Sequence, residues 1–358
     1  MSFVDPTRAP RKGEELDLNI VGDYLKKNIP GLSGDLAVEQ FPSGYSNLTY
    51  LLRMGDQELV LRRPPFGAKR IKAGHDMHRE YVILSALQKV YPPAPKPFVY
   101  CDDESVMGAS FYIMERKKGV ILRKDPPAGL AISPQIARKL CESFMDNLVA
   151  IHAIDYKAIG LGELGKPEGF LERQVNGWAE RYGNAKTDEI PEVEPLINWF
   201  KKNIPKSGAP TLIHNDYKFD NLVLDPDDLT HIIGVLDWEM STIGDPMLDL
   251  GVTFSYWVQR DDPDDLQLTR TVASNMDGLY TRQQIIEDYA KKTGRDISQM
   301  PFYYSFGLFK LAVIAQQIYY RFAQGFTKDE RFGMLLAAVK IQMKYALKVI
   351  ETQRMDFT

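Results

Sequence analysis

The run from His214 to Asn221, HNDYKFDN, holds the residue types that phosphoryl transfer requires. Such a transfer uses an acidic group that accepts or orients the proton of the acceptor hydroxyl, and oxygen ligands for a magnesium ion that neutralises the phosphates. A kinase catalytic loop supplies the first from an aspartate and part of the second from an asparagine five residues later. Asp216 and Asn221 stand at this spacing, with Lys218 between them. The spacing therefore predicts kinase chemistry.

A second carboxylate, Asp237, follows sixteen positions after Asn221 at the end of the apolar run IIGVLD. Residues 222–224 and 231–236 have the composition of strands, and residues 225–228 (DPDD) are turn formers. We expect this hairpin to bring Asn221 and Asp237 to neighbouring strand ends, where one metal ion can reach both. Asp and Asn are also common in turns without any chemistry, but their place between two strands favours a site.

Composition indicates a folded protein of two domains or lobes, with 358 residues of which 44% are hydrophobic and 26% charged. A net charge of -4 argues against broad binding of nucleic acid or of an anionic membrane. The two cysteines, Cys101 and Cys141, form neither a disulfide framework nor a zinc pattern, and residues 1–17 lack a signal peptide's apolar core. We therefore expect a cytoplasmic location.

The apolar segment 302–322 is too polar to span a bilayer and indicates a buried helix.

The order of the expected elements indicates an α+β, bilobal, protein-kinase-like fold. Residues 36–115 are rich in predicted strands, among them 50–54, 58–62 and 110–115, around one main helix at 74–90. Residues 116–119 (RKKG) form a charged connector, after which helical patterns dominate. We place a small β-rich nucleotide-binding lobe at residues 1–115 and a larger, mostly helical catalytic and substrate-binding lobe at residues 116–358.

A polar turn before the first clear strand is a candidate phosphate-binding element. It contains Gly44, Ser46 and Asn47, and a turn of small residues lets backbone N–H groups approach phosphate oxygens. The run has no GxGxxG pattern, so its position at the head of the sheet is the main support.

Strand alternation places Arg62 on the face opposite to its apolar neighbours, where a basic residue would contact the nucleotide phosphates. Glu80 lies in the apolar stripe of the helix 74–90, and a carboxylate there needs a partner. We expect the two to pair, although an arginine replaces the usual lysine and presents a planar, forked cation. The adenine edge would meet the backbone of Met114, Glu115 and Arg116 at the hinge.

The chain resembles the aminoglycoside phosphotransferase and choline kinase-like family, in particular the kinase-like domain fused to some acyl-CoA dehydrogenases. The runs that carry the resemblance are LVLRRPP, HREYVILSAL, LVAIHAID, LERQVNGW, LIHNDYKFDNLVLDP and IIGVLDWEMSTIGDPMLDLG. The resemblance implies a protein-kinase-like fold, ATP or GTP as co-substrate and Mg²⁺ as cofactor. It also implies Asp216 as the base and Asn221 with Asp237 as metal ligands.

Other polar residues near these motifs have simpler interpretations. Lys218 either meets the transferred phosphate or is a solvated loop lysine. Asp249 either braces the loop that carries Asp216, here called the base loop (residues 214–220), or caps a helix. His214 is expected to hold the backbone of this loop, and core packing explains His152. Residues 261–265 (DDPDD) indicate a solvated loop, or one that attracts a cationic acceptor.

The acceptor is predicted from a few basic side chains of the helical lobe. We expect a small-molecule alcohol, and Arg173, Lys310 and Arg321 favour an anionic one such as a hydroxyacyl-CoA or a related metabolite. An aminoglycoside or choline-like acceptor is the alternative. A nucleotide-binding protein of kinase shape without activity is a further alternative, and a metal-dependent hydrolase would need more ligands than this chain of five histidines shows. The sequence indicates no oligomeric state.

Overall fold

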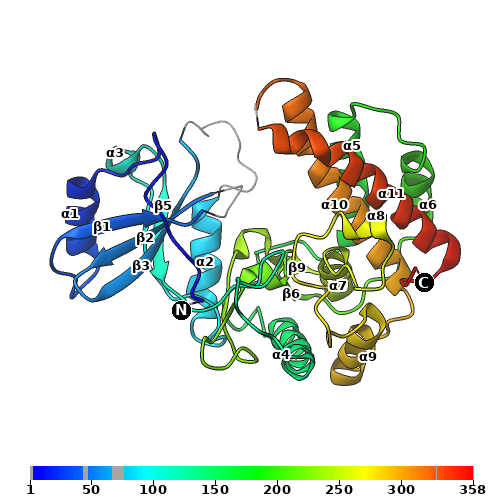
Figure 1. The fold of residues 1–358 in the computed structure, drawn as a ribbon, viewed down its shortest axis with the longest axis horizontal. Coiled ribbons are helices and arrows are strands. Elements are labelled where there is room, and N and C mark those ends of the chain that lie inside the picture. Colours follow the sequence, from blue (N-terminus) through cyan, green and yellow to red (C-terminus); the bar gives the residue numbers. More distant parts are fainter. Residues whose placement is uncertain (1–2, 43–46, 67–75, 328, 358) are drawn as a thin grey trace. The chain divides into compact units, whose positions relative to one another are not determined.

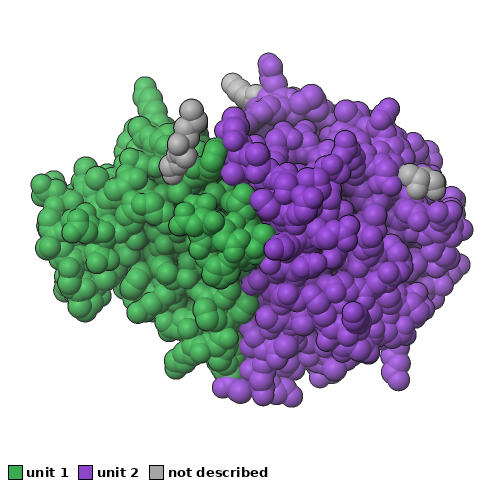
Figure 2. All heavy atoms as spheres, turned by 60° about the horizontal axis from the view of Figure 1, so that its bottom comes forward, with its two compact units in different colours: residues 1–121, 159–161, 221–241 green, residues 122–158, 162–220, 242–358 purple. Residues whose placement is uncertain are grey.

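The computed structural model describes residues 3–42, 47–66, 76–327 and 329–357. The chain divides into two compact units, coloured separately in Figure 2. The first unit comprises residues 1–121, 159–161 and 221–241, and the second comprises residues 122–158, 162–220 and 242–358. The predicted α+β kinase-like architecture is confirmed, with the sheet in the first unit and most helices in the second (Figure 1).

A five-stranded antiparallel sheet forms the centre of the first unit. Its order is β1-β2-β3-β5-β4. The strands are β1 (Leu36–Gln40), β2 (Leu48–Met54), β3 (Gln57–Arg63), β4 (Pro97–Cys101) and β5 (Phe111–Glu115). The predicted pair 50–54 and 58–62 is confirmed, since Met54 pairs with Gln57 across a two-residue turn at Gly55 and Asp56.

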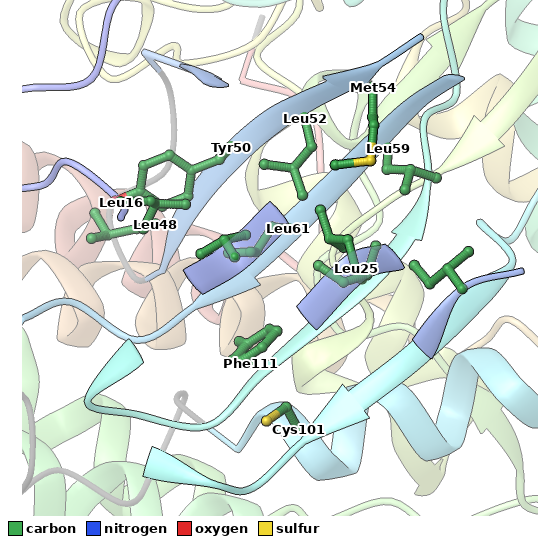
Figure 3. Close-up of a cluster of buried hydrophobic side chains, with 13 residues drawn as sticks. Leu16, Leu25, Leu48, Tyr50, Leu52, Met54, Leu59, Leu61, Cys101 and Phe111 are labelled. Atoms are coloured by element: carbon green, nitrogen blue, oxygen red, sulfur yellow. The ribbon is translucent and has the colours of Figure 1, made fainter. Parts of the chain in front are cut away.

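One face of this sheet forms an apolar core with α1 (Leu18–Asn28), a helix that sequence patterning did not predict. Asp17 caps the helix by accepting hydrogen bonds from the N–H groups of Asn19 and Ile20. Figure 3 shows Leu25 of α1 clustered with side chains of β2, β3, β4 and β5. Because this face is filled by apolar side chains, a buried charged side chain of the sheet is expected on the opposite face.

The opposite face contacts α2 (Met77–Leu87), which corresponds to the predicted helix 74–90. Leu59 and Leu61 belong to the α1-side core, so strand alternation turns Arg62 toward the α2 side, as predicted. The short helix α3 (Glu104–Met107) joins β4 to β5.

A second hairpin, β7 (Leu222–Leu224) and β8 (Ile232–Val235), also belongs to the first unit, followed by the 3₁₀ turn η2 (Trp238–Met240). Val120 and Leu224 exchange backbone hydrogen bonds at 2.9 and 2.8 Å, which attaches this hairpin to the chain that leaves the sheet. The expected boundary after Glu115 assigned residues 221–241 to the second lobe. Tertiary contacts group them with the first.

The second unit is mostly helical. Its elements are α4 (Pro134–His152), α5 (Phe170–Ala185), α6 (Val193–Lys202), β6 (Thr211–Ile213), β9 (Thr242–Gly244), α7 (Pro246–Ser255), α8 (Asp264–Gln267), α9 (Arg282–Thr293), α10 (Met300–Ala323), η3 (Glu330–Met334) and α11 (Leu335–Thr352). The 3₁₀ turn η1 (Phe219–Asn221) includes the end of the base loop and leads into β7.

Helix α10 is the buried helix that the apolar segment 302–322 predicted, and it packs against α5, α7 and α11 (Figure 1). It crosses α7 closely at Gly251 and Gly307, where an added Cβ would overlap backbone atoms of the other helix. This glycine pair lets Asp249 of α7 and Lys310 of α10 approach the same loop. Among the described residues, no helix has the length and apolarity needed to cross a membrane.

Candidate active site

In the first unit, Arg62 is the centre of a buried ionic cluster. Its guanidinium donates to Glu80 of α2 at 2.7 Å, as predicted, and contacts Asp237 at 3.2 Å and Glu239 at 3.5 Å. Arg62 is 7% exposed and Glu80 is 1% exposed. Glu80 also accepts a hydrogen bond from the Trp238 N–H at 3.1 Å, so one carboxylate ties the arginine to the turn after Asp237.

The charges of this cluster compensate for its burial. Burial alone disfavours the charged guanidinium, but the negative charges of Glu80, Asp237 and Glu239 hold the pKa of Arg62 well above its ordinary value. Sequence reasoning did not assign a role to Glu239, although its position two residues after Asp237 was a usable signal. Its carboxylate also accepts a hydrogen bond from the Asn47 side-chain amide.

The β7–β8 hairpin brings Asn221 and Asp237 to one end, as predicted. Leu222 pairs with Val235, and the Leu236 N–H donates to the Asn221 carbonyl at 2.8 Å. Asp237 adopts a left-handed backbone (φ 66°, ψ 61°), which aspartate tolerates better than most residues, and its side chain is 32% exposed.

The donor set at this hairpin end fits magnesium. The described residues contain no cluster of three or more His, Cys, Asp or Glu that could hold a metal. Asn221 and Asp237 instead offer an amide oxygen and a carboxylate. Mg²⁺ binds through one or two such protein groups together with phosphate and water oxygens.

Some predicted nucleotide-binding residues remain predictions. Gly44 and Ser46 lie outside the described residues. At the expected hinge, Met114 pairs with Val60 in the ladder between β3 and β5, and the Glu115 N–H donates to the Lys96 carbonyl. Arg116 forms an ion pair with Glu58 at 2.7 Å.

In the second unit, Asp249 holds the backbone of the base loop. Its two carboxylate oxygens accept from the N–H groups of His214 and Asn215, each at 2.7 Å. The predicted bracing role of Asp249 is therefore confirmed. Although full burial opposes ionisation, hydrogen bonds from His152 and the loop lower the pKa of Asp249 below its ordinary value.

His152 does more than pack in the core. Its Nε2 lies 3.1 Å from Asp249, and its Nδ1 lies 2.8 Å from the hydroxyl of Tyr289 on α9. The sequence interpretation as core packing was incomplete, because the partner lies 97 residues away along the chain. His152 fixes the carboxylate that in turn fixes the loop.

Lys218 forms an ion pair with Asp216 at 3.1 Å and lies 4.5 Å above the ring of Tyr256. Burial disfavours its charge, but Tyr256, Asp216 and Asp220 together hold the Lys218 pKa well above its ordinary value. Lys218 is therefore a charged partner of the expected base, rather than a solvated loop lysine. The sequence analysis did not identify Tyr256, at the end of α7, because no known motif links a residue at this distance along the chain to the base loop.

The acidic run 261–265 is only partly a solvated segment, since Asp261 and Asp264 are exposed but Asp262 and Asp265 are not. Asp262 is buried and forms a two-pronged ion pair with Arg282, at 2.7 and 2.6 Å. Asp265 forms an ion pair with Lys344 at 2.7 Å. Because these carboxylates already have partners within the second unit, they offer little uncompensated charge to a cationic ligand.

Comparison with known proteins connects this geometry to one family. The phosphotransferase enzyme family, APH, matches residues 37–279. Acyl-CoA dehydrogenase family member 11 of Rattus norvegicus is 33% identical over 88% of this chain. Acyl-CoA dehydrogenase family member 10 of Mus musculus is 33% identical over 90%. The chain spans only 41% and 30% of the lengths of these two proteins.

Solved structures show the same fold. A Ralstonia eutropha protein, provisionally named an aminoglycoside phosphotransferase, is 30% identical with a TM-score of 0.80, covering 94% of this chain and 99% of that one. Choline kinase from Cryptosporidium parvum is 14% identical with a TM-score of 0.63, covering 94% and 96%. Aminoglycoside phosphotransferase APH(4)-Ia, solved with ADP and hygromycin B, is 13% identical with a TM-score of 0.59, covering 92% and 98%. At these identities the last two matches show the fold alone.

Proposed function

Because the chain belongs to the phosphotransferase enzyme family, we propose that it transfers the γ-phosphate of ATP or GTP to the hydroxyl of a small-molecule alcohol. In this proposal Asp216 accepts or orients the hydroxyl proton, and Lys218 supplies positive charge to the transferred phosphoryl group. Arg62, oriented by Glu80, contacts the nucleotide phosphates. Asn221 and Asp237 hold Mg²⁺, which when bound would neutralise phosphate charge.

The observation that carries this proposal is the geometry of the base loop. Asp249 fixes the backbone of the two residues before Asp216 through two short hydrogen bonds. The Asp216 carboxylate forms an ion pair with Lys218 at 3.1 Å. A carboxylate fixed in this way, next to a lysine, is suited to orient a hydroxyl and to face a phosphoryl group.

We further propose that the acceptor is anionic or neutral, a hydroxyacyl-CoA or a related hydroxylated metabolite. Two observations favour this class over a cationic, choline-like or aminoglycoside acceptor. In the acidic run 261–265, Asp262 and Asp265 are compensated internally by Arg282 and Lys344. Lys310 places a buried ammonium next to the base loop, where it would repel a cation. Of the other two basic residues considered, Arg173 donates to backbone carbonyls of Lys166 and Glu168, and Arg321 is exposed.

The test is transfer of label from γ-labelled ATP and GTP, with Mg²⁺ or with EDTA. The acceptor panel contains a 3-hydroxyacyl-CoA, the free hydroxy acid, choline and an aminoglycoside. We expect Mg²⁺-dependent transfer to a hydroxylated anion. Transfer to choline or to the aminoglycoside alone would replace the proposed acceptor class. Nucleotide binding without transfer to any acceptor or to water would favour a binding protein that has lost catalysis.

A further inference from the structure

Lys310 is a buried cation that lies beside the base loop. It stands three residues after Gly307, where α10 approaches α7 most closely, and it is only 3% exposed. A lysine in such a place is unusual, since burying an ammonium without a partner is costly. Hydrophobic side chains would serve the packing of α10 better, so its presence requires a reason other than the stability of the helix.

The hydrogen bond that Lys310 makes reaches the residue before the expected base. Its ammonium donates to the side-chain oxygen of Asn215 at 3.3 Å. Asn215 has a left-handed backbone with φ of 66°, and its N–H donates to Asp249. Asn215 is therefore fixed from α7 through its backbone and from α10 through its side chain. Asp216 follows Asn215 directly in the chain. The two attachments of Asn215 therefore fix the position of the Asp216 backbone.

The charged groups near Lys310 lie in the base loop, on α7 and on α5. Burial lowers the pKa of Lys310 to about 8, the charges of Asp216 and Asp249 oppose that shift, and the charge of Arg181 on α5 adds to it. The ring of Trp178, also on α5, lies 5.5 Å from the ammonium. Among the described residues, no carboxylate forms an ion pair with Lys310, and Asn215 is its hydrogen-bond acceptor.

We propose that Lys310 is a positioning residue for the base loop: its charged ammonium holds Asn215, and through it Asp216, in the conformation that receives the acceptor hydroxyl. This inference rests on the proposed function, because it assumes that Asp216 is the base. Lys310 acts on Asp216 through Asn215. The effects on kcat of removing the two side chains should therefore not be additive.

A positioning role and a structural role predict opposite changes in stability when Lys310 is replaced. A folded-state pKa below the ordinary lysine value of about 10.4 means that the unfolded chain binds the proton more tightly. Protonated Lys310 therefore destabilises the fold at neutral pH, and this cost disappears as pH rises through about 8 toward 10. A residue that costs stability and yet orders the loop serves function. Lys310→Met should raise the melting temperature at pH 7 while lowering turnover.

The experiment compares Lys310→Met, Lys310→Arg, Asn215→Gly and the double variant Lys310→Met with Asn215→Gly. Lys340→Met, at an exposed position on α11, is the matched control. Glycine at residue 215 keeps the left-handed backbone and removes only the side chain. The first readout is phosphate release from γ-labelled Mg-ATP, with water as the acceptor, between pH 6.5 and 9. The second is amide hydrogen exchange of a peptide covering residues 214–218.

We expect Lys310→Met to lower kcat about 10²-fold, the size of effect that misplacing a reactive group produces, with the KM for ATP within about twofold. The double variant should lose no more than either single variant. Wild-type kcat should fall as pH rises through about 8, and Lys310→Arg should remove that fall, because arginine keeps its proton. Exchange of residues 214–218 should increase in Lys310→Met and not in Lys340→Met.

Two results would overturn the proposal. One is loop exchange and melting temperature in Lys310→Met equal to those of Lys340→Met. The other is a Lys310→Met variant with a lowered melting temperature and faster exchange throughout the second unit, since that would make Lys310 a structural residue. Failure of the proposed function is a separate outcome: the wild type would then release and transfer no phosphate, while the exchange measurement still decides whether Lys310 orders the loop.

Discussion

The Arg62 guanidinium donates to the Glu80 carboxylate at 2.7 Å, from the centre of the sheet to the helix that covers it, with both side chains buried. Removing one partner of a buried ion pair leaves the other charge uncompensated. Because Asp237 and Glu239 also contact this arginine, its loss would affect the turn that carries Asp237 as well.

We therefore expect Arg62→Met to lower the free energy of unfolding by about 3–5 kcal/mol. Arg53→Met is the matched control, because Arg53 contacts Glu39 and Glu58 at the surface of the same sheet, where a pair contributes about 0–1 kcal/mol. Urea unfolding of both variants measures the difference. Equal midpoints would show that the Arg62 cluster adds nothing to stability.

Asp237→Ala should remove the dependence of nucleotide binding on magnesium, because the carboxylate is one of the two proposed protein ligands. Calorimetry with ATP in the presence of Mg²⁺ and of EDTA measures this directly. Asp227→Ala, in the turn of the same hairpin, is the control and should bind as the wild type does. Wild-type magnesium dependence in Asp237→Ala would remove that residue from the metal site.

Asp249 gives the stability of the second unit a dependence on acid. Its pKa is lowered in the folded state, so its contribution is complete above the unfolded value of about 3.9 and is lost as pH falls through the folded value. Asp249→Asn should cost about 3 kcal/mol at pH 7. It should also flatten the fall in stability below about pH 4. The urea midpoints of the wild type and of Asp249→Asn at pH 7 and pH 3 measure this difference. An equal decrease in midpoint between pH 7 and pH 3 in the two proteins would contradict the prediction.

Tyr256 offers two separable contributions to the base loop. Burial raises its pKa first, and a hydrogen bond to Asp216 adds to that shift, while its ring lies under Lys218. Tyr256→Phe removes the hydroxyl and should lower kcat about tenfold, and Tyr256→Leu, which also removes the ring, should lower it further. Tyr280→Phe, which loses only an exposed hydrogen bond to Glu142, should leave kcat unchanged. Equal kcat in all three variants would exclude Tyr256 from positioning.

The parts of the site predicted correctly from sequence depend on local patterns. Strand alternation and helical spacing placed Arg62 opposite Glu80, and a turn between two short strands placed Asn221 beside Asp237. Each inference needed only neighbouring residues or a short hairpin. The same reasoning set the lobe boundary after Glu115. It could not include the bridge between Val120 and Leu224, because that bridge joins segments about a hundred residues apart.

The parts that were missed depend on partners distant in the chain. The contacts of His152 with Asp249, of Asp262 with Arg282 and of Lys310 with Asn215 each join separate helices or loops. From the sequence alone we predicted a buried histidine, an acidic loop and an apolar helix. The partners of these residues are seen only in the folded structure. The helix α1 was missed because its apolar residues form a stripe too short to stand out from the surrounding polar chain.

The role of Asp216 as the base is tested by comparing Asp216→Asn with the wild type in two assays on the same samples. We expect Mg-ATP binding by Asp216→Asn, measured by calorimetry, to stay within about twofold of the wild type. We expect transfer of labelled phosphate to an alcohol or to water to fall by about 10²–10⁴-fold, the usual contribution of a positioned base. Transfer by Asp216→Asn at the wild-type rate would show that Asp216 is not the base.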